Sequence, residues 1–224
     1  AQPSGDLALY LNLDSRFHYE DALRNASRID ATLARTAMAR HDSGLVLLDR
    51  ASGSDAVPPS DPGALLQRLR TVFASVLCDA GGCPVRQLPP LLLDQADEIW
   101  LVTDASIATL VSLDQALKHL AGQREREKRL QLVINRHDDS SGMSPEQIAR
   151  RFEVPLLATL PERPRVRLAA SQGHLLLQDA PRDPYLRALA PLVSRLDPAA
   201  CPVQAQGLRE RLSLALGGSQ WKTR

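Results

Sequence analysis

Short apolar runs that alternate with amphipathic helical patterns constrain the fold of this chain more than any other feature of its sequence. The runs that have the composition of buried strands are 44–48, 75–79, 98–103, 130–135 and 156–160. Helical patterns lie between them. This alternation is typical of βαβ units. We therefore expect an α/β fold, with a mostly parallel sheet and helices on both faces.

Residues that satisfy free backbone N–H groups mark the expected helix starts. Asp61 stands before a proline at the first helical position. Ser144 lies three residues before Gln147, which is the spacing of a capping box. Between Asp104 and Leu120, apolar residues recur every three or four positions. We expect a helix at each of these places.

Composition excludes several classes of protein. The 27 basic and 26 acidic residues leave a net charge of +1, so we expect no nucleic-acid partner. No apolar run reaches the roughly 18 residues that a membrane-spanning helix needs. An odd number of cysteines, three, fits a reducing compartment, so we expect a cytoplasmic location. The cysteines and histidines lack the paired spacing of zinc sites, and no serine lies in a Gly-x-Ser-x-Gly elbow.

Polar residues stand at the ends of four of the expected strands. They are Asp49, Asp79, Thr103 and Asn135. Parallel sheets bind ligands beyond the carboxyl ends of their strands, so these residues could line a binding site. Strand ends are also polar simply because they reach water, and the sequence leaves both interpretations open.

A series of motifs in a fixed order resembles a known superfamily. The motifs lie at 5–13, 77–82, 96–103, 134–136, 155–161 and 169–173. Their order is similar to that of the MinD/ParA superfamily of ATPases, which have a deviant Walker A loop. The Asn-Arg-His-Asp sequence at 135–138 favours the branch of CpaE/TadZ-like pilus assembly proteins.

The resemblance gives roles to Asp79 and the two residues Gly81 and Gly82. Asp79 would be the Walker B acid that holds Mg²⁺ through a water molecule, and a carboxylate suits this hard cation. Gly81 and Gly82 would form the switch loop. The alternatives are a solvated strand-end carboxylate and an ordinary turn.

The resemblance also implies an adenine site. Asn135 would read the base, because an amide can both donate and accept hydrogen bonds. Pro161 and Glu162 would flank the base from the neighbouring loop. The alternative for Asn135 is a cap on the next helix.

The phosphate-binding loop of the superfamily is not found in this sequence. No Gly-x-x-x-x-Gly-Lys-Ser/Thr or lysine-rich variant occurs, and the resemblance places that loop before Ala1. We therefore expect the first βα unit to be missing and an unpaired sheet edge to remain. The resemblance implies ATP and Mg²⁺ as cofactors of the complete protein. We expect weak or no ATP binding, and no hydrolysis, by this chain alone.

We expect residues 1–197 to form the ATPase-fold domain and 198–224 to form a tail. Leu208, Leu212 and Leu216 would lie on one stripe of a short helix in this tail. The stripe is similar to the amphipathic helix by which MinD binds the inner membrane. The alternative is packing on the domain itself or on a partner.

Two functions follow from the resemblance. The first is a CpaE/TadZ-like protein for assembly and localisation of a type IVb (Flp/Tad) pilus or secretion system. It would be a homodimeric nucleotide switch at the inner membrane or cell pole, with the assembly ATPase and membrane platform proteins as partners. The second is an active MinD/ParA-type ATPase in cell-division siting or DNA partitioning.

Overall fold

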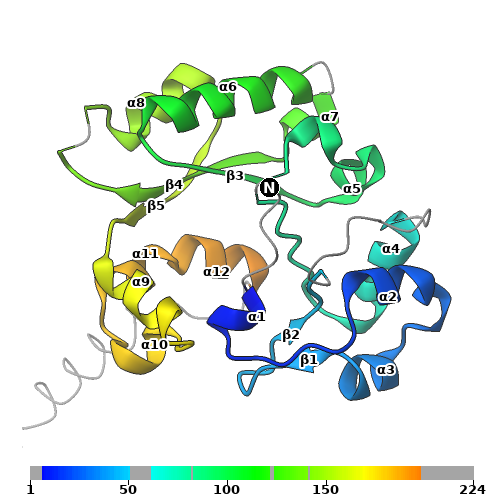
Figure 1. Cartoon of the computed structure of the whole chain (residues 1–224). Helices are drawn as coiled ribbons and strands as arrows, with labels where there is room; N and C mark the ends of the chain where they lie inside the picture. The colour runs from blue at the N-terminus through cyan, green and yellow to red at the C-terminus, as the bar shows by residue number, and fades with distance from the viewer. Residues whose placement is uncertain (1–6, 51–61, 82, 122–123, 141, 198–224) are drawn as a thin grey trace, which may run out of the picture.

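The sheet of this protein has three parallel strands, which confirms the expected α/β fold. The computed structural model describes residues 7–50, 62–81, 83–121, 124–140 and 142–197, with the side chains of 124 and 125 left out. The strands are β3 (Ile99–Thr103), β4 (Leu130–His137) and β5 (Leu156–Pro161). Their order is β3-β4-β5, so β4 lies in the centre (Figure 1).

Two helices cover one face of the sheet. Helix α6 (Ile107–Leu120) connects β3 to β4, and α8 (Pro145–Phe152) connects β4 to β5. Ser106 caps α6, and Ser144 and Gln147 form the expected capping box of α8. The core on this face contains the buried residues Leu93, Leu113, Leu120, Leu130, Leu132, Ile134, Ile148 and Val154.

The opposite face carries α11 (Pro184–Ala188) and α12 (Ala190–Leu196). Val133, Ala158 and Leu160 are buried there beneath side chains of these two helices. Trp100 packs on the same cluster, and its indole N–H donates to Glu98 at 2.7 Å. Helices therefore cover both faces of the sheet, as the sequence predicts.

A separate apolar core lies among the N-terminal helices. The elements around it are α2 (Tyr19–Arg24), the 3-10 helix η1 (Ala26–Arg28), α3 (Ala31–Thr36) and α4 (Pro62–Val72). Helix α4 begins at Pro62 as expected, whereas Asp61 lies outside the described residues. Leu65 of α4 is 2% exposed and anchors this core.

The expected strand at 44–48 does not join the parallel sheet. Only Val46–Leu47 (β2) is a strand, and it pairs antiparallel with Ala39–Arg40 (β1). Gly44, at φ +92°, lies in the turn that returns the chain onto itself. β1 and β2 pair with each other because closing the short loop between them costs little entropy.

The expected strand at 75–79 is not formed. These residues carry no strand pairing, and Leu77 is 63% exposed. A strand needs a neighbour that supplies ladder hydrogen bonds, and neither β2 nor β3 pairs with this segment. Ser75 is instead fixed by its hydroxyl, which donates to the Leu196 carbonyl at 3.0 Å.

The remaining described elements are short, apart from α9. They are α1 (Leu7–Tyr10), η2 (Val85–Gln87), α5 (Pro90–Gln95), α7 (Arg124–Glu127), α9 (Pro164–Ser171) and α10 (Leu176–Asp179). In the part of the chain that the structure describes, no helix has the length and apolar character needed to cross a membrane.

Among the residues that the structure describes, no strand pairs with the outer edge of β3, and this predicts self-association. Val102 on this strand is 62% exposed, and free strand edges pair with other chains. We expect Val102→Lys to weaken concentration-dependent association in sedimentation velocity by at least about tenfold. Its unfolding free energy should change by no more than about 0.5 kcal/mol.

Val111→Lys is the matched control, because Val111 is 51% exposed but lies on helix α6. It should leave association unchanged. Equal effects of the two lysine variants, or no association by the parent chain, would show that the β3 edge is not a pairing site.

Candidate functional site

The carboxyl ends of β4 and β5 bring the predicted adenine-site residues to one rim of the sheet. His137 pairs with Pro161 in the ladder, and the Glu162 N–H donates to the His137 carbonyl at 2.8 Å. Asn135 lies two residues before His137 on β4. The structure thus places Asn135, Pro161 and Glu162 on neighbouring strand ends.

An irregularity of β4 shapes this rim. The register between β4 and β5 shifts between Ile134 and His137, so Asn135 and Arg136 form a bulge. Arg136 has φ +53°, a left-handed conformation that costs energy for a residue with a side chain. The Asn135 side-chain oxygen stabilises it by accepting from the Arg136 N–H at 2.9 Å. Bulges of this kind redirect side chains next to binding sites.

Asn135 keeps free hydrogen-bonding capacity. Its oxygen has a second lone pair, and its NH₂ group has no partner among the described residues. It does not cap the next helix, because Ser144 caps α8. The amide can therefore both donate to and accept from a planar ligand edge.

Two arginines flank Glu162. One carboxylate oxygen lies 3.1 Å from Arg136 Nε and the other lies 3.2 Å from Arg167 Nη2. The Glu162 side chain is 30% exposed, so these ion pairs hold its position more than they stabilise the fold. This connection between β4 and α9 was not predicted, because the residues are distant in sequence.

Asp104 directly follows β3, the third strand that ends at this rim. Its carboxylate accepts from the Ser106 N–H at 2.8 Å and from the Thr109 hydroxyl at 2.6 Å. The Ser106 and Thr109 hydrogen bonds lower the pKa of Asp104, and the Arg136 charge adds to this effect. Asp104 therefore shapes the turn into α6 and carries a negative charge at the rim.

His137 has an unusual environment at this rim. Its ring is 16% exposed, and Nδ1 is buried without a hydrogen-bond partner among the described residues. Nε2 lies 3.4 Å from Asp139. Buried polar atoms without partners are uncommon and often belong to functional sites. The Asn-Arg-His-Asp motif was the only sequence signal for this residue.

Asp79, the predicted magnesium ligand, makes a local contact. Its carboxylate accepts from the Gly81 N–H at 2.8 Å, which closes a turn. Burial raises the pKa of Tyr19, and the neighbouring Cys78 adds to the shift, so this segment lies beside α2. Among the described residues, no hydrogen bond or ion pair joins Asp79 to the rim. Gly82 lies outside the described residues.

Gly81 lies close to the Asp79 side chain. A Cβ atom there would lie 2.9 Å from Asp79 Oδ1, which is closer than atoms normally approach. A larger residue at position 81 would therefore move the exposed Asp79 side chain.

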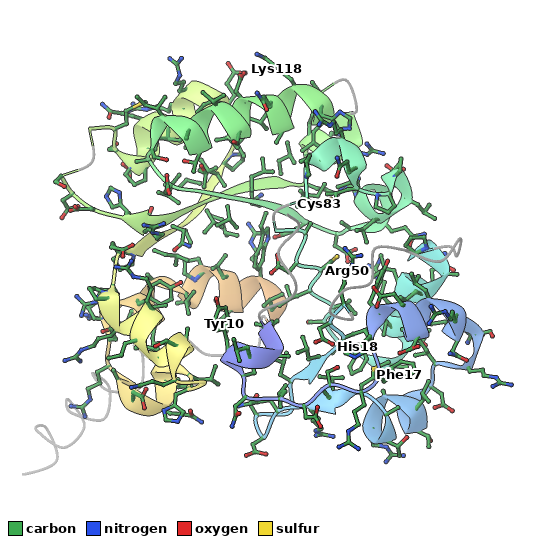
Figure 2. The ribbon with its side chains drawn as sticks, viewed as in Figure 1. Tyr10, Phe17, His18, Arg50, Cys83 and Lys118 are labelled. Carbon is green, nitrogen blue, oxygen red and sulfur yellow. The ribbon has the colours of Figure 1, made fainter. Side chains whose placement is uncertain are left out.

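A Ser-His-Asp group near α2 is structural; its histidine, His18, is labelled in Figure 2. The Ser15 hydroxyl donates to Asp49 at 2.7 Å, and His18 Nδ1 lies 3.0 Å from the same carboxylate oxygen. A nucleophile must contact its general base, but Ser15 and His18 both contact Asp49 instead. Together with the Tyr19 N–H, which donates to the Asp49 carbonyl at 2.7 Å, they fix the start of α2 to the chain beyond β2.

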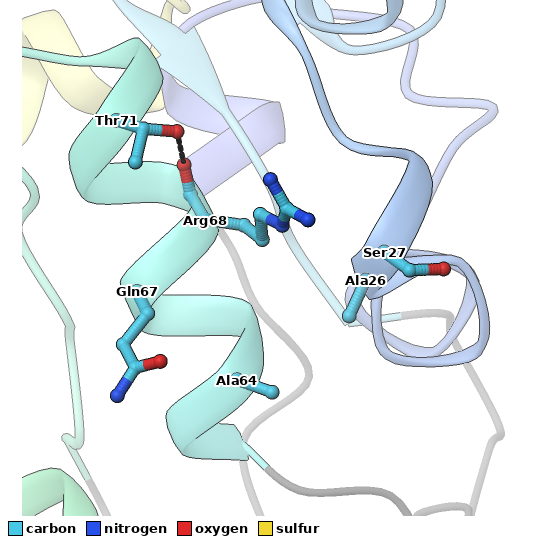
Figure 3. Close-up of a pocket in the computed structure, with 6 residues that line it drawn as sticks. All are labelled: Ala26, Ser27, Ala64, Gln67, Arg68 and Thr71. Carbon is cyan, nitrogen blue, oxygen red and sulfur yellow. Dashed lines mark hydrogen bonds between the residues drawn. The ribbon is translucent and has the colours of Figure 1, made fainter.

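The cleft between η1 and α4 offers no catalytic chemistry (Figure 3). Its volume is about 440 Å³, and its lining residues are Ala26, Ser27, Ala64, Gln67, Arg68 and Thr71. The Thr71 hydroxyl donates to the Arg68 carbonyl and so remains within its own helix. No group of three histidine, cysteine or acidic residues suited to a metal ion occurs in the described part of the chain.

The turn after β5 is held by a buried ion pair. Arg163 Nη2 donates to Asp183 Oδ2 at 3.0 Å, and the Asp183 side chain is 1% exposed. Asp183 Oδ1 accepts from the Tyr185 N–H at 3.0 Å and caps α11. This pair fixes the segment that presents Glu162. The tail residues Leu208, Leu212 and Leu216 lie outside the described part of the chain.

The fold of this chain, a parallel sheet between two helical layers, is similar to that of solved ParA and MinD structures. The chain is similar to a ParA family ATPase from Chlorobium tepidum TLS, with a TM-score of 0.67, 21% identity, and coverage of 82% of this chain and 78% of that one.

Two MinD structures are also similar. MinD of Aquifex aeolicus in a MinC:MinD complex gives a TM-score of 0.63, 16% identity, and coverage of 89% of this chain and 81% of that one. The septum site-determining protein MinD of Pyrococcus horikoshii OT3, complexed with Mg-ADP, gives a TM-score of 0.60 and 22% identity. The match covers 88% of this chain and 80% of that one. No family model and no curated protein matches the sequence.

Loss of the Asp183 charge should destabilise the protein in a pH-dependent manner. The Tyr185 N–H and then Arg163 lower the pKa of Asp183 below its ordinary value of 3.8. Its carboxylate therefore stabilises the fold above that pH, and this contribution disappears as the pH falls through the lower folded-state pKa. We expect Asp183→Asn to cost about 1–2 kcal/mol at pH 7 in urea unfolding.

The difference between variant and parent should shrink as the pH falls below 3.8 and disappear below the lower folded-state pKa of Asp183, where the folded parent is also protonated. Asp139→Asn is the control, because the Asp139 side chain is fully exposed. A loss of stability by Asp183→Asn that is equal at pH 7 and at the acid limit would show that charge is not the cause.

Proposed function

We propose that this chain belongs to a CpaE/TadZ-like protein that localises and assembles a type IVb pilus or secretion system. Its nucleotide-binding face would be the rim of the sheet. The proposal depends on one observation: Asn135 lies in the irregular end of β4, and Glu162 follows the end of the neighbouring β5, so both are at the carboxyl ends of the strands. In open α/β sheets this is the position where ligands bind.

The chemistry of the rim supports recognition of a base. Asn135 offers both a donor and an acceptor to a heterocyclic edge. Pro161 follows on the neighbouring strand and provides an apolar surface, while Arg136 and Arg167 hold the Glu162 carboxylate in place. In the complete protein, ATP and Mg²⁺ would be the cofactors, with Asp79 as the metal ligand and Gly81 and Gly82 as the switch loop.

In the complete protein, nucleotide would act as a switch. Phosphoryl transfer depends on a positioned phosphate cradle and on charge stabilisation, and the residues given contain no Gly-x-x-x-x-Gly-Lys-Ser/Thr loop. These residues would supply the base-binding part of the nucleotide site. Nucleotide would then regulate which partner the protein binds.

A site with a base-binding part but no phosphate cradle predicts weak nucleotide binding by the 224-residue chain. A titration with a fluorescent ATP analogue should give a dissociation constant of about 1 mM or weaker, since most affinity would come from the phosphates. Asn135→Ala should remove the residual signal, and Gln115→Ala, an exposed amide on α6, should not. Micromolar binding would contradict the assignment of the phosphate cradle to another segment.

The proposed partners follow from the pilus branch. The protein would form a homodimer and bind the assembly ATPase and inner-membrane platform proteins. It would act in the cytoplasm at the inner membrane or cell pole, where the stripe formed by Leu208, Leu212 and Leu216 could bind lipid or one of these partners. The Asn-Arg-His-Asp sequence at 135–138 supports this branch.

Disruption of the gene in its host would separate the two candidate functions. We expect loss of surface pili in electron micrographs, with normal division sites and chromosome content. Complementation with Asn135→Ala should restore less than about a tenth of the pili, which corresponds to a tenfold loss of switch occupancy. Gln115→Ala should restore them fully. Minicells or DNA-free cells with normal pili would instead support an active MinD/ParA-type ATPase.

A further inference from the structure

A second cleft lies between the first turn of α9 and the loop from α10 to α11. Its volume is about 340 Å³, and three arginines line it: Arg163, Arg165 and Arg182. Helices α9, α10 and α11 form the part of the molecule below β5 in Figure 1. The cleft is separate from the base-binding face, because neither Asn135 nor Glu162 lines it.

The three arginines have N–H groups that donate to no acceptor among the described residues. Arg165 and Arg182 are exposed, and neither makes a hydrogen bond or close ion pair with another described residue. Arg163 uses one terminal nitrogen for Asp183, but its Nε is buried without a partner among the described residues. Each guanidinium has five N–H donors, so donors outnumber the available acceptors.

The acidic residues of the cleft leave this excess in place. Asp183 is occupied by Arg163 and by the Tyr185 N–H, and its side chain is 1% exposed. Asp179 is the other acidic residue of the cleft, so the three arginines leave one positive charge in excess of the two carboxylates. The first turn of α9 has no acidic residue and no side-chain cap, so the positive end of its dipole also faces this region.

We propose that this cleft binds a phosphate-type oxyanion, carried by a small phosphorylated solute or by a phospholipid headgroup. Guanidinium groups match the planar pairs of oxygens on phosphate and can donate two parallel hydrogen bonds to them. Arg165 lies on α9 and Arg182 lies in the loop before α11, so they line the cleft from different elements. Arg163 keeps its contact with Asp183 when the anion binds.

Inorganic phosphate is the first probe. Isothermal titration of the full chain at constant ionic strength, with chloride as the balancing anion, should show saturable binding. The double variant Arg165→Ala, Arg182→Ala should weaken the dissociation constant by at least about tenfold. The double variant Arg86→Ala, Arg151→Ala is the matched control. Both residues are exposed, and neither forms a side-chain hydrogen bond or ion pair with another described residue.

The control removes the same charge and should bind phosphate like the parent. Equal affinities of the two double variants, or phosphate binding that does not saturate, would overturn the proposal. Thermal unfolding of each variant in chloride alone checks that the fold is retained. If the cleft variant does not fold, Arg182→Ala alone replaces it, since Arg182 lies in a loop.

Vesicles distinguish the two sources of the phosphate. Co-sedimentation with phosphatidylglycerol vesicles, compared with phosphatidylcholine vesicles, should fall in the cleft variant but not in the control if a headgroup is bound. Equal sedimentation of both variants, together with weakened binding of inorganic phosphate by the cleft variant, identifies a soluble phosphorylated ligand. Both results support the cleft as an oxyanion site, and they differ only in its source.

Discussion

The burial of β4 on both faces is the constraint on which the rest of the structure depends. Leu132, Val133 and Ile134 are consecutive residues with 0–2% exposure, so apolar layers must cover both sides of this strand. α6 and α8 supply one layer, and α11 and α12 supply the other. With its neighbours parallel to it, β4 fixes three strand ends at one rim. The position of Asn135 is a consequence of that burial.

The same principle explains which elements the sequence could predict. A strand buried on both faces needs a continuous apolar run, and β3, β4 and β5 all have one. The runs at 44–48 and 75–79 have a similar composition, but an apolar run does not specify its partner. Leu77 remains 63% exposed because no described strand pairs with its segment. Composition predicts extended backbone, whereas pairing depends on neighbours that local sequence does not encode.

The connections at the rim were not predictable from the sequence. The resemblance to the MinD/ParA superfamily selected Asn135, Pro161 and Glu162, and their neighbouring positions could be expected because parallel strands end at one edge. The ion pair of Arg136 with Glu162 joins residues 26 positions apart, and the left-handed conformation of Arg136 follows from a register shift. These features result from tertiary packing. Asp79 shows the opposite case, because its motif was clear while its observed contact is a local turn.

The proposed base-binding rim and the proposed anion-binding cleft are adjacent in sequence. The Glu162 side chain extends to Arg136 and Arg167, and the next side chain, that of Arg163, extends to Asp183. If both proposed ligands bind, a ligand that moves Glu162 would act on the segment that positions Arg163, and an anion on Arg163 would act on Glu162. Coupling of two sites through a shared element is reciprocal in free energy. The turn after β5 would then be the physical connection between the two proposed sites.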